Sequence, residues 1–124
     1  LMKKHWQTQI SLSLPRLRPA DKVPDFPSIP DSVYARFFFA LRLILPDAGL
    51  ILSTRESPRM RDGLARICIT QMSAGSKTEP GGYSGSGALE QFAVQDDRSV
   101  EEVCRMLRTA DLEPVFVDWT GVMK

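Results

Sequence analysis

Strand-like and helix-like segments alternate along the chain, and this alternation restricts the fold more than any other feature. Strands are predicted at residues 10–14, 50–54, 69–73 and 114–117, and apolar residues recur at helical spacing between them. This order predicts an α/β fold, because parallel strands are joined by right-handed helical crossovers. Four strands and three helices would form half of an eight-stranded (β/α) barrel of the TIM type. An open doubly wound sheet is the alternative, but no dinucleotide fingerprint favours it.

Each predicted helix has a recognisable beginning. Asp31 stands at an N-cap position, Ser57 precedes a proline at the first helical position, and Ser99 with Glu102 fits a capping box. The apolar spacing predicts one buried face for each helix. These faces are Val33, Phe37, Ala40, Leu41 and Ile44, then Met60, Leu64, Ile67 and Cys68, and finally Val100, Val103, Cys104 and Leu107.

The charge and the cysteines exclude several classes of protein. With 16 basic and 15 acidic residues the net charge is +1, which gives no reason to expect a nucleic-acid or membrane partner. The two cysteines, Cys68 and Cys104, form neither a disulfide framework nor a metal spacing, so structural roles in the cytoplasm are expected. No apolar run approaches the roughly 18 residues of a membrane span. The chain begins at Leu1, and we expect its natural N-terminus to lie upstream.

Polar residues follow every predicted strand at the same end, where the active sites of parallel barrels lie. The segments are Pro15-Arg16-Leu17-Arg18, Ser53-Thr54-Arg55-Glu56, Ser73-Ala74-Gly75-Ser76 and Asp118-Trp119. Side chains alternate between the two faces of a strand, so Leu50 and Leu52 should pack on the helices. The side chains predicted to point into the barrel are Ser53, Arg55, Gln71, Ser73 and Asp118. Such an interior suits a small polar ligand.

Arg55 is the sharpest candidate for a binding residue. Its planar guanidinium can bind a carboxylate through two hydrogen bonds. The alternative is a salt bridge, with Glu56 or between loops, that braces the rim of the barrel. Arg16 and Arg18 share parity, and at least one of them is expected to be a solvated charge at that rim.

Ser73 and Ser76 could donate hydrogen bonds to a substrate, or could instead stabilise turns. The glycine-rich segment 75–87 that contains Ser76 predicts a long loop, a type of segment that is often functional. A serine hydrolase is not expected, because Ser53 or Ser57 would need a histidine partner. The single histidine, His5, stands near the start of the chain, where a surface position is expected.

Three ordered motifs resemble a known family. They are Pro-Arg-Leu-Arg-Pro-Ala at residues 15–20, Leu-Ser-Thr-Arg-Glu-Ser at residues 52–57, and Ser-Ala-Gly-Ser-Lys-Thr-Glu-Pro-Gly-Gly-Tyr at residues 73–83. Together they resemble the C-terminal region of the radical S-adenosylmethionine aromatic amino acid lyases. Gln91-Phe92 and Asp96-Asp97-Arg98 fit as well, so the resemblance covers nearly the whole chain from about residue 9.

The resemblance implies cleavage of the Cα–Cβ bond of L-tyrosine to p-cresol and dehydroglycine (2-iminoacetate). The family uses a 4Fe–4S cluster and S-adenosylmethionine, and dehydroglycine passes to thiazole synthase for the thiazole of thiamine. Arg55 matches the family's carboxylate-binding arginine, and Ser73 or Ser76 would assist it. Asp118-Trp119 near the end of the chain resembles the thiamine-biosynthesis branch rather than the hydrogenase-maturing branch. Tryptophan as the substrate stays open.

One departure from the family is large. The cluster motif Cys-x-x-x-Cys-x-x-Cys is absent, and Cys68 and Cys104 cannot replace it. We therefore expect residues 1–124 to be the C-terminal half of the barrel, to need the N-terminal half as a partner, and to be inactive alone. Two other hypotheses stay open: a non-catalytic half barrel that binds a partner through its open sheet edges, and a small-molecule binder that uses Arg55.

Overall fold

Three short strands form one parallel sheet in the order β1-β2-β3. The structure, a computed structural model, describes residues 4, 8–17, 27–77 and 94–116. The strands are β1 (Ser11–Ser13), β2 (Gly49–Leu52) and β3 (Gln71–Met72). In the parallel register Ser13 pairs with Ile51, and Ile51 pairs with Gln71. These three side chains therefore lie on one face of the sheet.

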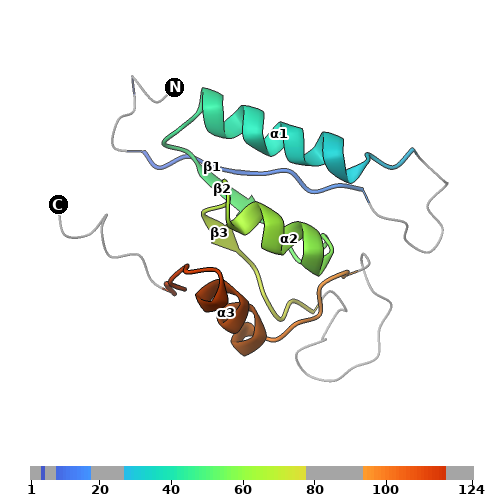
Figure 1. Cartoon of the computed structure of the whole chain (residues 1–124). Coiled ribbons are helices and arrows are strands. Elements are labelled where there is room, and N and C mark those ends of the chain that lie inside the picture. The colour runs from blue at the N-terminus through green and yellow to red at the C-terminus, as the bar shows by residue number, and fades with distance from the viewer. Residues whose placement is uncertain (1–3, 5–7, 18–26, 78–93, 117–124) are drawn as a thin grey trace.

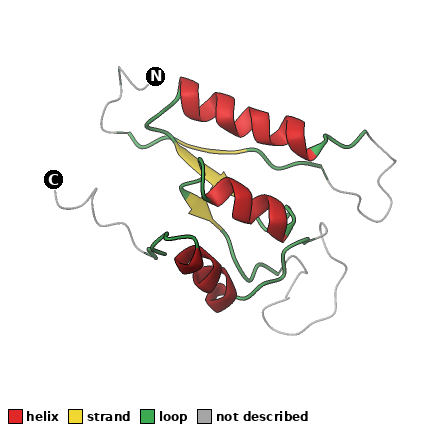
Figure 2. Cartoon of the chain, in the orientation of Figure 1, coloured by secondary structure: helices red, strands yellow, loops and turns green. Residues whose placement is uncertain are grey.

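A helix follows each strand in the chain. The helices are α1 (Asp31–Ile44), α2 (Pro58–Ala65) and α3 (Val100–Thr109), and Figures 1 and 2 show them side by side in that order. The predicted α/β class, with parallel strands alternating with helices as in part of a (β/α) barrel, is confirmed. Among the described helices, none has the length and apolar character to cross a membrane.

The core lies between the sheet and the helices. Leu50 and Leu52 of β2 are fully buried in a cluster with Tyr34 and Phe38 of α1 and Leu64 of α2. This confirms the prediction from strand parity that the two leucines pack on the helices. Burying each large apolar side chain contributes about 1.5–3 kcal/mol, so this cluster is the main stabilising feature of the fold.

The predicted buried face of α1 is wrong by one position except at Leu41, which is half-buried and packs against the core. Tyr34 and Phe38 are buried, whereas Phe37 is 53% exposed, Ile44 is 73% exposed, and Val33 is also exposed. The helix contains three consecutive phenylalanines and is apolar around most of its circumference. Apolar spacing alone therefore could not identify the face that packs on the sheet.

The first turn of α1 also differs from expectation. The helix begins at Asp31 itself, Pro30 is the N-cap, and no side chain caps this end. Asp31 Oδ1 instead accepts a hydrogen bond from Arg16 at 2.8 Å. A long-range ion pair has thus replaced the local cap predicted from the sequence.

The other two helix starts are as predicted. Ser57 Oγ accepts a hydrogen bond from the Met60 backbone N–H, and Ser99 and Glu102 form the reciprocal capping box at 3.2 and 2.8 Å. Their predicted buried faces are confirmed in part: Leu64, Cys68, Val103 and Cys104 are buried, Met60 and Leu107 are half-buried, and one residue of each face is exposed. Ile67 lies beyond the end of α2 and Val100 in the first turn of α3, and both are exposed.

The predicted last strand is wrong for residues 114–116, and residue 117 lies outside the described residues. Val115 and Phe116 are exposed and form no strand. The neighbouring strand β3 is only two residues long, so it offers few backbone groups with which a further strand could pair. The described part of the chain therefore has three strands rather than the expected four.

Candidate functional site

Ser53 and Ser73 follow neighbouring strands at the carboxyl edge of the sheet. Leu52 pairs with Met72, and the Ser73 N–H donates to the Leu52 carbonyl at 3.2 Å, so the ladder continues to the edge. Both serines have the parity of Gln71, which is exposed on the face opposite the leucine core. The structure thus brings two of the predicted binding residues together at one edge.

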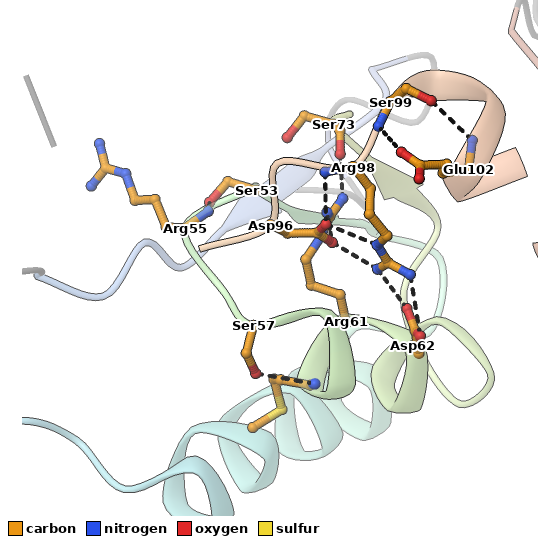
Figure 3. A network of polar contacts seen from close by, with 11 residues as sticks. Ser53, Arg55, Ser57, Arg61, Asp62, Ser73, Asp96, Arg98, Ser99 and Glu102 are labelled. Atoms are coloured by element: carbon orange, nitrogen blue, oxygen red, sulfur yellow. Dashed lines mark hydrogen bonds and ion pairs between the residues drawn. The ribbon is translucent and has the colours of Figure 1, made fainter. Parts of the chain in front are cut away.

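Arg55 lies in the turn that follows β2. Its backbone N–H donates to Ser53 Oγ at 3.4 Å, and its side chain is half-buried. Figure 3 shows the guanidinium pointing away from the ion network on the other side of this turn. Ser76 is half-buried three residues after Ser73. Arg18, Asp118 and Trp119, also singled out from the sequence, lie outside the described residues.

Arg16 is buried and is held by protein groups. Its Nε donates to Glu56 Oε2 at 3.0 Å, and its Nη1 donates to Asp31 Oδ1 and to the Ile29 carbonyl, both at 2.8 Å. The guanidinium carbon lies 4.3 Å from the centroid of the Tyr34 ring, a cation–π distance. The hydrogen bond to Glu56 raises the pKa of Arg16. Arg16 is therefore not a solvated rim charge, and it joins the end of β1 to the end of β2.

A second ion pair, between Arg61 and Asp96, lies fully buried beside the edge (Figure 3). Arg61 of α2 donates through Nη1 to Asp96 Oδ2 and through Nη2 to the backbone carbonyl of Ser73. The Asp96 backbone N–H donates to the Thr54 carbonyl at 3.1 Å, and the Gln95 N–H donates to the same oxygen at 3.0 Å. Residues 95–96 thus contact the loop that follows β2 directly, and Arg61 links Asp96 to the loop that follows β3.

Arg98 extends this ion pair towards solvent. It donates to Asp96 Oδ1 at 2.8 Å and Oδ2 at 2.7 Å, and its Nη2 donates to Asp62 Oδ1 at 2.7 Å. These hydrogen bonds, first to Asp96 and then to Asp62, raise the pKa of Arg98. Burial by itself raises the pKa of Asp96, but the hydrogen bonds from Arg98 and the charge of Arg61 lower it overall. Burial lowers the pKa of Arg61 despite its partner Asp96.

The sequence patterns assign no role to Arg61 or Asp96, and they offer Glu56 only as an alternative salt-bridge partner of Arg55. A usable signal existed for Arg61, since it lies three and four residues before the buried Leu64 and Ala65 and therefore on the core-facing side of α2. An arginine at such a position indicates a buried ionic partner. Asp96 was noted only within the family motif Asp96-Asp97-Arg98.

The described residues do not fit an iron–sulfur cluster. They contain no group of three or more histidine, cysteine or acidic side chains that could hold a metal ion. Cys68 and Cys104 are both buried and free. Burial raises the pKa of the Cys68 thiol, which disfavours the thiolate that a cluster requires.

Comparisons with known proteins identify the family of the chain. Residues 13–113 match the model of the Biotin and Thiamin Synthesis associated domain. The chain belongs to this family. The domain is 43% identical over 125 residues to 2-iminoacetate synthase of Escherichia coli K12, covering 99% of this chain and 33% of the relative. The enzyme of the same name from Salmonella typhimurium LT2 is 41% identical over 121 residues, covering 96% of this chain and 32% of the relative.

Solved structures share the fold of the domain. The crystal structure of HydG, a maturase of the FeFe-hydrogenase, superposes with a TM-score of 0.86 at 35% identity and covers 98% of this chain and 27% of that chain. HydG from Carboxydothermus hydrogenoformans gives 0.77 at 34% identity, with 99% and 28% covered. The domain thus spans about one third of the length of its curated relatives. The predicted resemblance to the radical S-adenosylmethionine tyrosine lyases is confirmed.

Proposed function

We propose that this chain is part of a radical S-adenosylmethionine lyase that cleaves the Cα–Cβ bond of L-tyrosine to p-cresol and 2-iminoacetate. The observation that carries the proposal is the 43% identity to 2-iminoacetate synthase over 99% of the chain. The site supports it, because Ser53, Arg55 and Ser73 stand at the carboxyl edge of the sheet, where barrel enzymes bind substrates.

In this proposal the chain binds and orients the amino acid. Arg55 holds the carboxylate of tyrosine through two hydrogen bonds, and Ser53, Ser73 and Ser76 donate further hydrogen bonds to the same end of the substrate. Arg16, also predicted to bind substrate, would have to give up Glu56 or Asp31 to do so. Its contribution is instead to fix Glu56, which is directly adjacent to Arg55 in the chain.

The remaining parts of the reaction lie outside the described residues. A 4Fe–4S cluster and S-adenosylmethionine, bound by the N-terminal half of the barrel, would supply the radical that starts the cleavage. The isolated chain should therefore be inactive. The enzyme would act in the cytoplasm and would pass its product to thiazole synthase.

A chimera tests this function. The aligned third of the E. coli relative is replaced by this chain, the cluster is reconstituted, and p-cresol release from tyrosine is measured with S-adenosylmethionine and a reductant. We expect turnover, and we expect Arg55→Ala to raise the KM for tyrosine about 10- to 100-fold, as for the loss of a charged hydrogen bond.

The matched control is Arg59→Ala, which removes an exposed arginine from α2 and should leave the KM unchanged. A cluster-loaded chimera that releases no p-cresol would refute the lyase proposal. Equal KM values for Arg55→Ala and Arg59→Ala would refute only the role of Arg55.

A hydrogenase-maturase tyrosine lyase is the second candidate, because the HydG structure superposes with a TM-score of 0.86. Both candidates release p-cresol, so the chimera assay does not separate them. The two candidates are separated by testing whether the chimera restores growth of a thiamine-requiring strain without added thiamine. Rescue by the chimera favours the thiamine branch, and p-cresol release without rescue favours the maturase branch.

A further inference from the structure

Residues 95–98 connect the two loops of the proposed substrate site. The Thr54 carbonyl, between Ser53 and Arg55 in the chain, accepts hydrogen bonds from the Gln95 and Asp96 N–H groups at 3.0 and 3.1 Å. This carbonyl belongs to the peptide unit that leads into Arg55. Anchoring it therefore fixes the direction in which the chain enters Arg55.

The loop that follows β3 is attached to the same segment. The Ser73 carbonyl accepts a hydrogen bond from Arg61, whose other terminal nitrogen is paired with Asp96. Two residues further on, the Gly75 N–H donates to the Arg98 carbonyl at 3.2 Å. Gly75 has a φ of +61°, so the chain turns here in the left-handed region that favours glycine.

Stability alone gives a weak reason for this ionic arrangement. A buried ion pair is seldom more stabilising than well-packed apolar side chains of similar volume. Arg61 Nε is also buried with no hydrogen-bond partner among the described residues, which adds a desolvation penalty. A guanidinium, however, can hold a carboxylate and a carbonyl at once in fixed directions, whereas an apolar side chain cannot.

We infer that Asp96 and Arg61 are positioning residues, which set the separation between the Ser53–Arg55 turn and Ser73 and so determine how tightly the amino acid end of the substrate is held. The inference rests on the proposed function. Neither residue is required to touch the substrate. Both act through backbone carbonyls, those of Thr54 and Ser73, that adjoin or belong to the binding residues.

The test uses the same chimera with Asp96→Asn, Arg61→Lys and the control Asp62→Asn. In the part of the chain that the structure describes, Asp62 is hydrogen-bonded to Arg98 and to neither loop. Its variant therefore removes an ion pair of the same network but keeps the bonds of Asp96 and Arg61. Arg61→Lys keeps the positive charge beside Asp96, but an ammonium cannot reproduce the two-sided fork that also reaches Ser73. This variant keeps the test usable if Asp96→Asn does not fold.

Three quantities are measured: the Kd of tyrosine by calorimetry, the KM and kcat for p-cresol release, and the thermal unfolding midpoint. Asp96→Asn and Arg61→Lys should each raise the Kd and KM at least about tenfold, since small misplacements of binding groups have large effects. Asp62→Asn should change both by less than about twofold, as expected for a partly exposed ion pair.

A purely structural role gives a different result. Both variants would then lower the unfolding midpoint and the yield of active enzyme but leave the Kd and KM at wild-type values, and the inference would be wrong. If the unsubstituted chimera itself fails to bind tyrosine, the proposed function fails, and that failure is recognised before any variant is compared.

Discussion

Two ion clusters join neighbouring strand ends, and they differ in how far water reaches them. The β1–β2 cluster consists of Arg16, Glu56 and Asp31, and the β2–β3 cluster consists of Arg61, Asp96, Arg98 and Asp62. In the first, Arg16 is 7% exposed but Asp31 is 63% exposed. In the second, Arg61 and Asp96 are fully buried, and even the outer pair, Arg98 and Asp62, is only 20% and 33% exposed.

This difference in exposure indicates which side of the sheet edge tolerates substitution. A charge that keeps a solvated partner can rearrange when its buried partner is lost, whereas a charge with no route to water stays unpaired in the interior. Arg16 retains Asp31 and the Ile29 carbonyl if Glu56 is removed. Within the described residues, the side chain of Arg61 would retain only its hydrogen bond to the Ser73 carbonyl if Asp96 were removed. We therefore expect the β2–β3 side of the site to be the more rigid, and we expect its stability to be the more sensitive to substitution of a charged residue.

Asp96→Ala should have the largest effect on stability. It leaves the buried Arg61 without its carboxylate and also removes the main partner of Arg98, so the free energy of unfolding should fall by about 3–5 kcal/mol. Urea unfolding of the chain followed by circular dichroism measures this loss. If Glu56→Ala in the β1–β2 cluster lowered the free energy of unfolding more than Asp96→Ala does, the ranking of the two clusters by sensitivity would be reversed.

Glu56→Gln should have an intermediate effect. The amide keeps the shape of the side chain but loses the charge that Arg16 faces, and hydrogen bonds to charged groups contribute about 1.5–3 kcal/mol. The remaining contacts of Arg16 with Asp31 and Ile29 should hold the loss within that range. The same urea experiment measures this loss. A loss as large as that of Asp96→Ala would show that the exposed partner Asp31 does not compensate Arg16 for the loss of Glu56.

The pH dependence of stability should identify the ionic part of the β2–β3 cluster. The pKa of Asp96 is lowered in the folded chain, so its stabilising contribution is complete above the unfolded-state aspartate pKa of about 3.9 and is lost as the pH falls through the folded-state pKa. The difference in unfolding free energy between wild type and Asp96→Asn should therefore shrink below about pH 4. A difference that stays constant from pH 6 to pH 2 would mean that shape, not charge, stabilises this cluster.

The parts of the fold that depend on near neighbours could be predicted from the sequence. The caps at Ser57 and Ser99 involve residues three positions away, and the inward direction of Leu50 and Leu52 follows from the period of a strand. The place of Ser53 at the carboxyl edge follows from strand order alone. Each of these features is determined within a few residues of sequence.

The ion clusters could not be predicted in the same way. Arg61 and Asp96 are 35 residues apart, and Arg16 and Glu56 are 40 apart, so neither pairing leaves a periodic trace in the sequence. The buried face of α1 could not be predicted for a related reason. Its apolar residues surround most of the helix, and only the sheet on which it packs selects Phe38 over Phe37.

Asp31→Asn should have the smallest effect on stability, and it tests directly how much the exposed ion pair with Arg16 contributes. Asp31 is 63% exposed, and an asparagine oxygen can still accept the hydrogen bond from Arg16 Nη1. Loss of the exposed charge pair should lower the free energy of unfolding by at most about 1 kcal/mol, and this value includes the weaker interaction of the first turn of α1 with its helix dipole. Raising the salt concentration should narrow the difference from wild type further, because exposed pairs are screened. A loss above about 2 kcal/mol that salt does not change would mean that Asp31 belongs to a cluster as closed to water as the one around Asp96, and the two strand junctions would then be equivalent.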